Sequence, residues 1–80
     1  MRWTRDAIAT EATRLDEYAA AKLEGAADCD QAATDPSLSD RERQVNASAA
    51  STLRGQASDM QGFAAALRDG VSPEELGYAG

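Results

Sequence analysis

Several residue types that usually carry chemistry are rare or missing in this 80-residue sequence. It contains no histidine and a single cysteine, Cys29. The absence of histidine removes the commonest general base, metal ligand and pH switch. A lone cysteine cannot form a disulfide within the chain, and with no recognisable secretory signal it predicts a reducing, cytoplasmic location. No apolar run approaches the roughly 20 residues of a membrane-spanning helix.

Motifs for catalysis or metal binding are missing as well. Neither a dinucleotide-binding glycine pattern nor a phosphate-binding loop occurs. Asp28, Asp30 and Asp35 lie close together in the sequence. Their spacing matches no calcium loop, and a helix directs Asp28 and Asp30 to different faces. We therefore expect no enzyme activity, no cofactor and no metal site.

Large apolar residues are scarce. Leu, Ile, Val and Phe together number ten, a level that borders on disorder when the net charge is −6. Eighteen alanines favour helix strongly, but each buries little surface. A two-helix hairpin of this composition should be marginal as a monomer, so the composition predicts self-association, with a dimer favoured.

The charge balance bears on the class of partner. The chain has fourteen acidic and eight basic residues, and its isoelectric point is about 4.4. An acidic chain with scattered basic residues is unsuited to nucleic acid or to an anionic membrane. We expect a protein partner, either a second copy or another protein, with no nucleic acid and no membrane.

The first helix is predicted over about residues 4–33. Thr4 is a suitable N-cap, with Trp3 placed to pack on Ile8. From Ile8 onward, apolar or small residues recur at alternating spacings of four and three, which is typical of a helix-packing seam. Gly25 leaves two alternatives: the helix continues through it, or it bends or ends there and restarts at Asp28. A turn over residues 34–38, which contains a proline, follows.

The second helix is predicted over about residues 39–69, with a length of roughly 46 Å. Ser39 and Glu42 form a capping box, and Gly70 provides the stop. Its apolar stripe has a mean spacing of about 3.67 residues. The stripe consists of Val45, Ala49, Leu53, Gln56 or Ala57, Met60, Phe63 or Ala64, and Leu67. Between residues 44 and 58 the only charge is Arg54, which predicts more than one buried face; the alternative is a tolerant Ala/Ser surface without a partner. We assign self-association to Val45, Ala49, Thr52, Leu53, Gln56, Met60 and Phe63.

The C-terminal segment predicts a short helix over about residues 72–77. Ser72 and Glu75 match a capping box around Pro73, and Gly77 ends the helix. Such a short helix is unstable alone. Val71, Leu76 and Tyr78 are therefore expected to dock on the hairpin or on a second subunit. The alternative is a linear motif that another protein reads.

Together these patterns predict one all-α domain over residues 1–80. It is an antiparallel helical hairpin of two long helices plus a short C-terminal helix, dimerising into a four-helix bundle. The function hypothesis is a noncatalytic, acidic protein-interaction module that self-associates through Ala/Ser-rich helices. One alternative is a phage- or mobile-element-type protein that binds or inhibits a host protein through its acidic helix or its tail. Another is a structural subunit of a larger particle.

Overall fold

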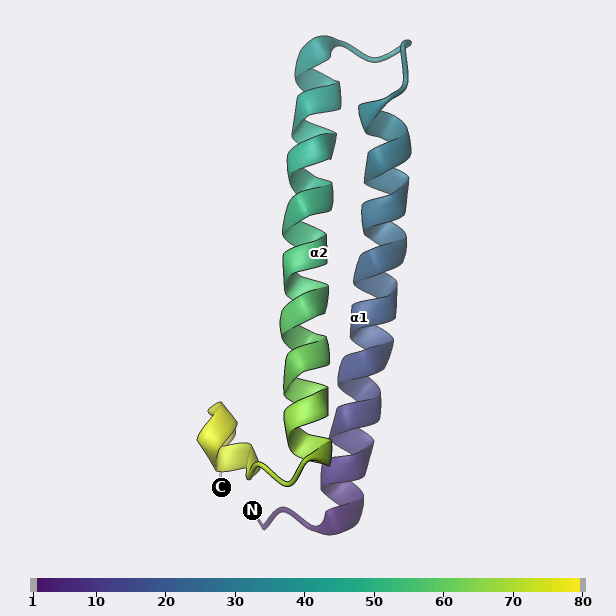
Figure 1. The fold of residues 1–80 in the computed structure, drawn as a ribbon. Coiled ribbons are helices and arrows are strands. Elements are labelled where there is room, and N and C mark those ends of the chain that lie inside the picture. Colours follow the sequence, from purple (N-terminus) through teal and green to yellow (C-terminus); the bar gives the residue numbers. More distant parts are fainter. Residues whose placement is uncertain (1, 80) are drawn as a thin grey trace.

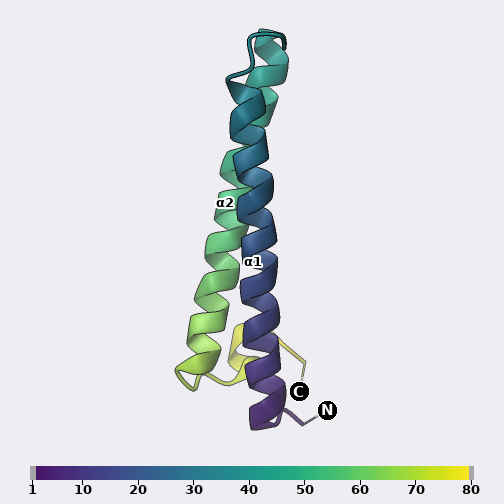
Figure 2. The same ribbon diagram turned by 90° about the vertical axis from the view of Figure 1, so that its right-hand side faces the viewer.

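The chain folds into a long antiparallel hairpin of two helices. The computed structural model describes residues 2–79, in which α1 (Arg5–Ala33) and α2 (Asp40–Arg68) are followed by the 3-10 helix η1 (Pro73–Leu76). The molecule measures 52 × 19 × 17 Å. Both views show α1 and α2 running side by side, with η1 and both chain ends at the open end of the hairpin (Figures 1 and 2). The predicted all-α hairpin is confirmed.

Both long helices begin with a side-chain cap. The Thr4 hydroxyl accepts a hydrogen bond of 3.0 Å from the N–H of Ala7. At the start of α2, the Ser39 hydroxyl accepts from the Glu42 N–H, and the Glu42 carboxylate accepts from the Ser39 N–H, each at 3.1 Å. These bonds satisfy N–H groups that have no partner within a helix. Each start is therefore fixed by residues within one turn.

Two glycines end helical segments in the left-handed conformation. Gly70 has φ 95°, and the Val71 N–H donates to the Ala66 carbonyl at 3.0 Å, as in a Schellman motif. Gly77 has φ 96° and follows η1, where the Tyr78 N–H donates to the Pro73 carbonyl at 3.0 Å. The Cβ of any other residue would be strained in this conformation. The two glycines thus turn the chain back towards the hairpin.

The capping box expected at Ser72 is wrong. The Ser72 side chain makes no capping hydrogen bond, and the segment is a 3-10 turn. In that tighter geometry the N–H of Glu75 donates to the Ser72 backbone carbonyl at 3.1 Å. The N–H that the hydroxyl would have capped is therefore already bonded.

The turn between the long helices is held by Arg43. Its guanidinium donates to the backbone carbonyls of Asp35 and Leu38 and to the carboxylate of Asp40. The Asp35 carboxylate in turn accepts from the Ser37 hydroxyl at 2.7 Å and from its N–H at 2.9 Å, which lowers the pKa of Asp35. The closed end of the hairpin is thus stabilised by polar contacts more than by burial.

The seam between α1 and α2 is built largely from alanine. Its members recur at spacings of three, four or seven residues, as in a heptad repeat. The buried apolar residues are Ala12, Leu15, Ala19 and Ala26 of α1 and Ala50, Ala57, Ala64 and Leu67 of α2. Among residues 2–79, no large side chain is less than 2% exposed. The seam therefore brings two backbones close together but buries few large apolar groups.

The seam on α2 differs from the stripe expected there. Ala50 is 1% exposed, whereas Val45 is 59% exposed. A stripe spaced at about 3.67 residues drifts around the helix relative to a seam spaced at 3.5. In the C-terminal half of α2 the predicted stripe and the seam lie on the same side of the helix. In the N-terminal half they lie on different sides.

Gly25 does not interrupt α1, which is continuous from Arg5 to Ala33. A Cβ atom at this position would lie 3.3 Å from the Leu53 Cδ1 of α2. This is tighter than an ordinary contact between carbon atoms. Glycine therefore lets the Leu53 side chain lie against the α1 backbone.

We expect Leu67→Ala to lower the free energy of unfolding by about 2–3 kcal/mol, because it leaves a cavity in the buried cluster. Leu67 is 3% exposed and packs with Ala12, Leu15 and Ala64. The matched control is Leu23→Ala, since Leu23 is 41% exposed, and it should cost about 0.5 kcal/mol or less. Urea unfolding followed by circular dichroism checks both; equal losses would contradict the assigned core.

Candidate protein-interaction surface

The residues assigned to self-association fall into two groups in the structure. Leu53 lies against Gly25, and Met60 packs on the buried cluster, so both belong to the seam within the hairpin. The others are exposed, except for Ala49, which is half-buried. We call this second group the outer strip; it comprises Val45, Ala49, Thr52, Gln56 and Phe63.

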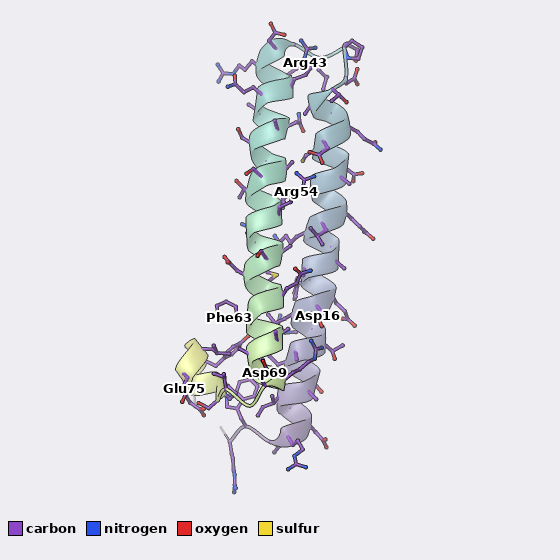
Figure 3. The ribbon with its side chains drawn as sticks, in the orientation of Figure 1. Asp16, Arg43, Arg54, Phe63, Asp69 and Glu75 are labelled. Atoms are coloured by element: carbon purple, nitrogen blue, oxygen red, sulfur yellow. The ribbon has the colours of Figure 1, made fainter. Side chains whose placement is uncertain are left out.

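The outer strip occupies one side of α2. Val45 and Thr52 are seven residues apart, as are Ala49 and Gln56 and then Gln56 and Phe63, so each pair returns to nearly the same direction. Phe63 points away from α1 (Figure 3). Val45 is 59% and Phe63 41% exposed, and no strip residue carries a charge. The strip thus combines exposed apolar groups at its ends with small or polar, uncharged groups between them.

The one charge in the middle of α2 is used within the hairpin. Arg54 forms an ion pair with Asp30 of α1, and Arg68 pairs with Asp16 of α1 at 2.7 Å. Both arginines, and both aspartates, are 14 residues apart, so the two pairs lie on the same flank. Each pair is about half exposed, so it fixes orientation more than it adds stability. Arg54 is nine residues, or two and a half turns, from Val45, so it lies on the opposite side of α2 from the outer strip.

Two glycines border the outer strip without an evident role in the hairpin. Gly55 and Gly62 lie seven residues apart in the interior of α2 and are exposed. A Cβ at either position would meet nothing within 4 Å among residues 2–79. Glycine in a helix interior costs about 1 kcal/mol relative to alanine. The hairpin would therefore be more stable with alanine at both positions.

A shallow hollow lies at the N-terminal end of the strip. Its lining residues are Arg41, Gln44, Val45 and Ser48. They stand at positions i, i+3, i+4 and i+7, the four that surround a hole in knobs-into-holes packing. Two further hollows lie on α1, and both include Arg14 and Glu17 in their lining.

The C-terminal segment lies against the open end of the hairpin. Leu76 packs on the buried cluster, and Val71 is half-buried. The Tyr78 ring stands edge-to-face on Trp3, with 5.4 Å between centroids. The Trp3 Nε1–H donates to the Ala79 carbonyl at 2.9 Å. Residues near the two ends of the chain are therefore joined directly, and no pattern in the sequence indicates this contact of Trp3.

Glu11 is a buried acidic residue at the centre of this contact. Its carboxylate accepts two hydrogen bonds of 2.6 Å from the Arg14 guanidinium and one from the Tyr78 hydroxyl. The Arg14 bonds lower the pKa of Glu11 despite its burial. The pKa of Tyr78 is raised, mainly by burial and secondly by its hydrogen bond to Glu11. Arg14 also lies over the Tyr18 ring, 5.1 Å from its centroid.

Asp30 and Asp35, two of the acidic residues near Cys29, have separate structural roles. Asp30 pairs with Arg54, and Asp35 bonds within the turn. In the described part of the chain, no three histidine, cysteine or acidic side chains are placed to hold a metal ion. Cys29 is a half-buried free thiol. Over the same residues, no helix has the length and apolar character to cross a membrane.

These features define a class by architecture: a helical hairpin with an alanine seam, a docked C-terminal segment and an exposed, uncharged strip on its second helix. Comparisons with protein-family models, with curated proteins and with solved structures find no match. No family is therefore assigned to the chain.

Docking of the C-terminal segment should depend on pH at both extremes. Arg14, within α1, is the main cause of the lowered pKa of Glu11, and the Tyr78 hydroxyl adds to it. The Tyr78 part stabilises the docked state above the usual pKa of 4.5, and it is lost as the pH falls through the folded-state pKa of Glu11. The raised pKa of Tyr78 stabilises the docked state at pH values below 10.0, the usual pKa of a tyrosine. That contribution is lost as the pH rises through the folded-state pKa of Tyr78.

The fluorescence of Trp3, the only tryptophan, should report both transitions. Tyr78→Phe keeps the ring but removes the hydroxyl, so it should abolish the alkaline transition. An unchanged alkaline transition in this variant would show that another group is responsible.

Proposed function

We propose that this chain is a noncatalytic protein-interaction module that self-associates through the outer strip of α2. Two copies would form an elongated four-helix bundle with the two α2 helices in the middle. The supporting observation is that small side chains are buried while larger apolar ones are exposed. The buried seam is mostly alanine, whereas Val45 and Phe63 are 59% and 41% exposed. The single free thiol, Cys29, suits a reducing compartment such as the cytoplasm.

The apolar groups at the ends of the strip favour association energetically. Complete burial of a valine or phenylalanine side chain contributes about 1.5–3 kcal/mol relative to full exposure. A symmetric dimer would bury Val45 and Phe63 of both copies, although these side chains are already partly buried in the hairpin. Small domains with few large buried groups gain most from such additional burial. Self-association would therefore add burial that the alanine seam cannot supply.

The size of the strip limits the strength of the association. Val45 and Phe63 are separated by about 27 Å along the helix axis, and a helix is about 10 Å wide. Such a contact is smaller than the roughly 800 Å² per partner of a standard interface. The net charge of −6 on each copy also opposes association. We therefore expect a reversible dimer with a dissociation constant in the micromolar range.

Analytical ultracentrifugation between about 5 and 500 µM, a range chosen for micromolar affinity, should show the mass rising from 8.4 kDa towards twice that value. Phe63→Glu should keep the chain monomeric, because a carboxylate would lose its hydration in the interface. Leu23→Glu is the matched control, since Leu23 has the same 41% exposure and lies on α1.

A helical chain that stays at 8.4 kDa throughout this range would refute the proposed function. Equal loss of dimer in the two glutamate variants would place the contact elsewhere than on the outer strip.

A further inference from the structure

We infer that the two copies pack with their α2 helices antiparallel, about a two-fold axis that crosses the outer strip at the level of Leu53 and Arg54. Phe63 of each copy then enters the hollow of the other, between Arg41, Gln44, Val45 and Ser48. This inference rests on the proposed function and adds the identity of the partner surface and its register.

The spacing of the strip supports one long helix as the partner. Val45 and Phe63 are 18 residues apart, which is five helical turns, so the two side chains project in the same direction. A single straight helix can therefore cover both ends. In a parallel arrangement with two-fold symmetry, Phe63 would face Phe63, and the two hollows would face each other unfilled. The antiparallel arrangement places a large side chain against a hollow at both ends.

The hollow on α2 is a better receptor for Phe63 than the hollows on α1. Arg14 and Glu17 contribute to both α1 hollows, and Arg14 is already bonded to Glu11. A phenylalanine ring there would cover charged groups without replacing their hydration. The α2 hollow has a single charged residue in its lining, Arg41, contains the exposed Val45 and lies on the same helix side as Phe63.

The same register accounts for the two bordering glycines. With the two-fold axis near position 54, Thr52 lies opposite Gly55 of the second copy. Val45 lies opposite Gly62 of the second copy, near its Phe63. Glycine allows a facing helix to approach closely because it has no Cβ. The dimer thus gives Gly55 and Gly62 a role that the hairpin alone does not.

Charge complementarity at the ends favours the same orientation. Arg41 lies at the end of the strip opposite Phe63, and Glu74 and Glu75 are exposed in the C-terminal segment. Figure 3 places Glu75 near the C-terminal end of α2, beyond Phe63 along the helix axis. The two-fold axis brings Arg41 of the second copy to this acidic end. An exposed pair of this kind contributes little energy but disfavours the reverse orientation, which would bring the acidic ends together.

Disulfide trapping tests the register. In a Cys29→Ser background, the double variant Val45→Cys/Gly62→Cys should form a covalent dimer under mild oxidation, because these positions face each other across the interface. The matched controls are the single variants Val45→Cys and Gly62→Cys, because each cysteine would lie about 25 Å along the helix axis from the same cysteine of the second copy. We expect at least a tenfold slower formation of their covalent dimers. Comparable trapping of either single variant, which a parallel dimer would give, would overturn the register.

Glycine replacement gives a second test with opposite effects on folding and association. Gly55→Ala should raise the thermal unfolding midpoint of the monomer and weaken the dimer at least tenfold, because the added Cβ lies in the interface. Gln61→Ala is the control, as Gln61 is exposed and lies on the flank of Arg54; its dimer affinity should stay within twofold. An unchanged dissociation constant for Gly55→Ala would overturn the inference.

Different results would overturn the dimer and its antiparallel register. A monomeric unmodified chain would overturn the proposed function and this register together. A dimer that is sensitive to Phe63→Glu but traps as well through Val45→Cys alone or Gly62→Cys alone would overturn the register alone.

Discussion

The close approach of α1 and α2 along an alanine seam is the constraint on which the rest of the structure depends. Small side chains on both helices, together with Gly25, leave room for Leu53 against the α1 backbone but for few other large groups. Large apolar residues are consequently concentrated at the open end of the hairpin or left on its outer surface. The buried cluster at the open end contains Leu15 and Leu67, covered in part by Leu76.

The two ends of the hairpin are therefore stabilised by different interactions. The closed end depends on backbone hydrogen bonds from Arg43 and on the capping box of Ser39. The open end depends on burial and on the contact of Tyr78 with Trp3 and Glu11. The C-terminal segment is thus an integral part of the packing at that end. Any protein that recognised Tyr78 in an extended tail would first have to displace these contacts.

The sides of α2 have distinct roles. One side forms the seam with α1, and a second carries the ion pairs of Arg54 and Arg68. The outer strip lies on a third side, without charge and with large apolar groups at both ends. Arg54 lies nine residues from Val45, which is two and a half turns, so its charge is on the opposite side of α2 from the strip. This division is why a single helix can serve both the hairpin and the proposed dimer.

Local features were predictable from the sequence because they depend on residues within one or two turns. The caps at Thr4 and Ser39, the stop at Gly70 and the repeat along α1 are of this kind. The sides of α2 are less distinct in the sequence: Leu53 and Met60 fall into one predicted group with Val45 and Phe63, because neighbouring stripes on a helix look alike in sequence. Which of them faces α1 depends on the register between the helices.

By itself, the sequence determined that the chain forms two long helices joined by a short turn, since caps, alanine content and periodicity act locally. Only the tertiary structure decided which polar groups meet across the hairpin. Asp30 and Arg54 are 24 residues apart, and Tyr78 and Glu11 are 67 residues apart. Their pairing follows from the packing of the two helices and the turn at Gly70. Helix packing likewise decided which apolar side chains remain exposed on α2, because each helix buries only the side that its neighbour covers.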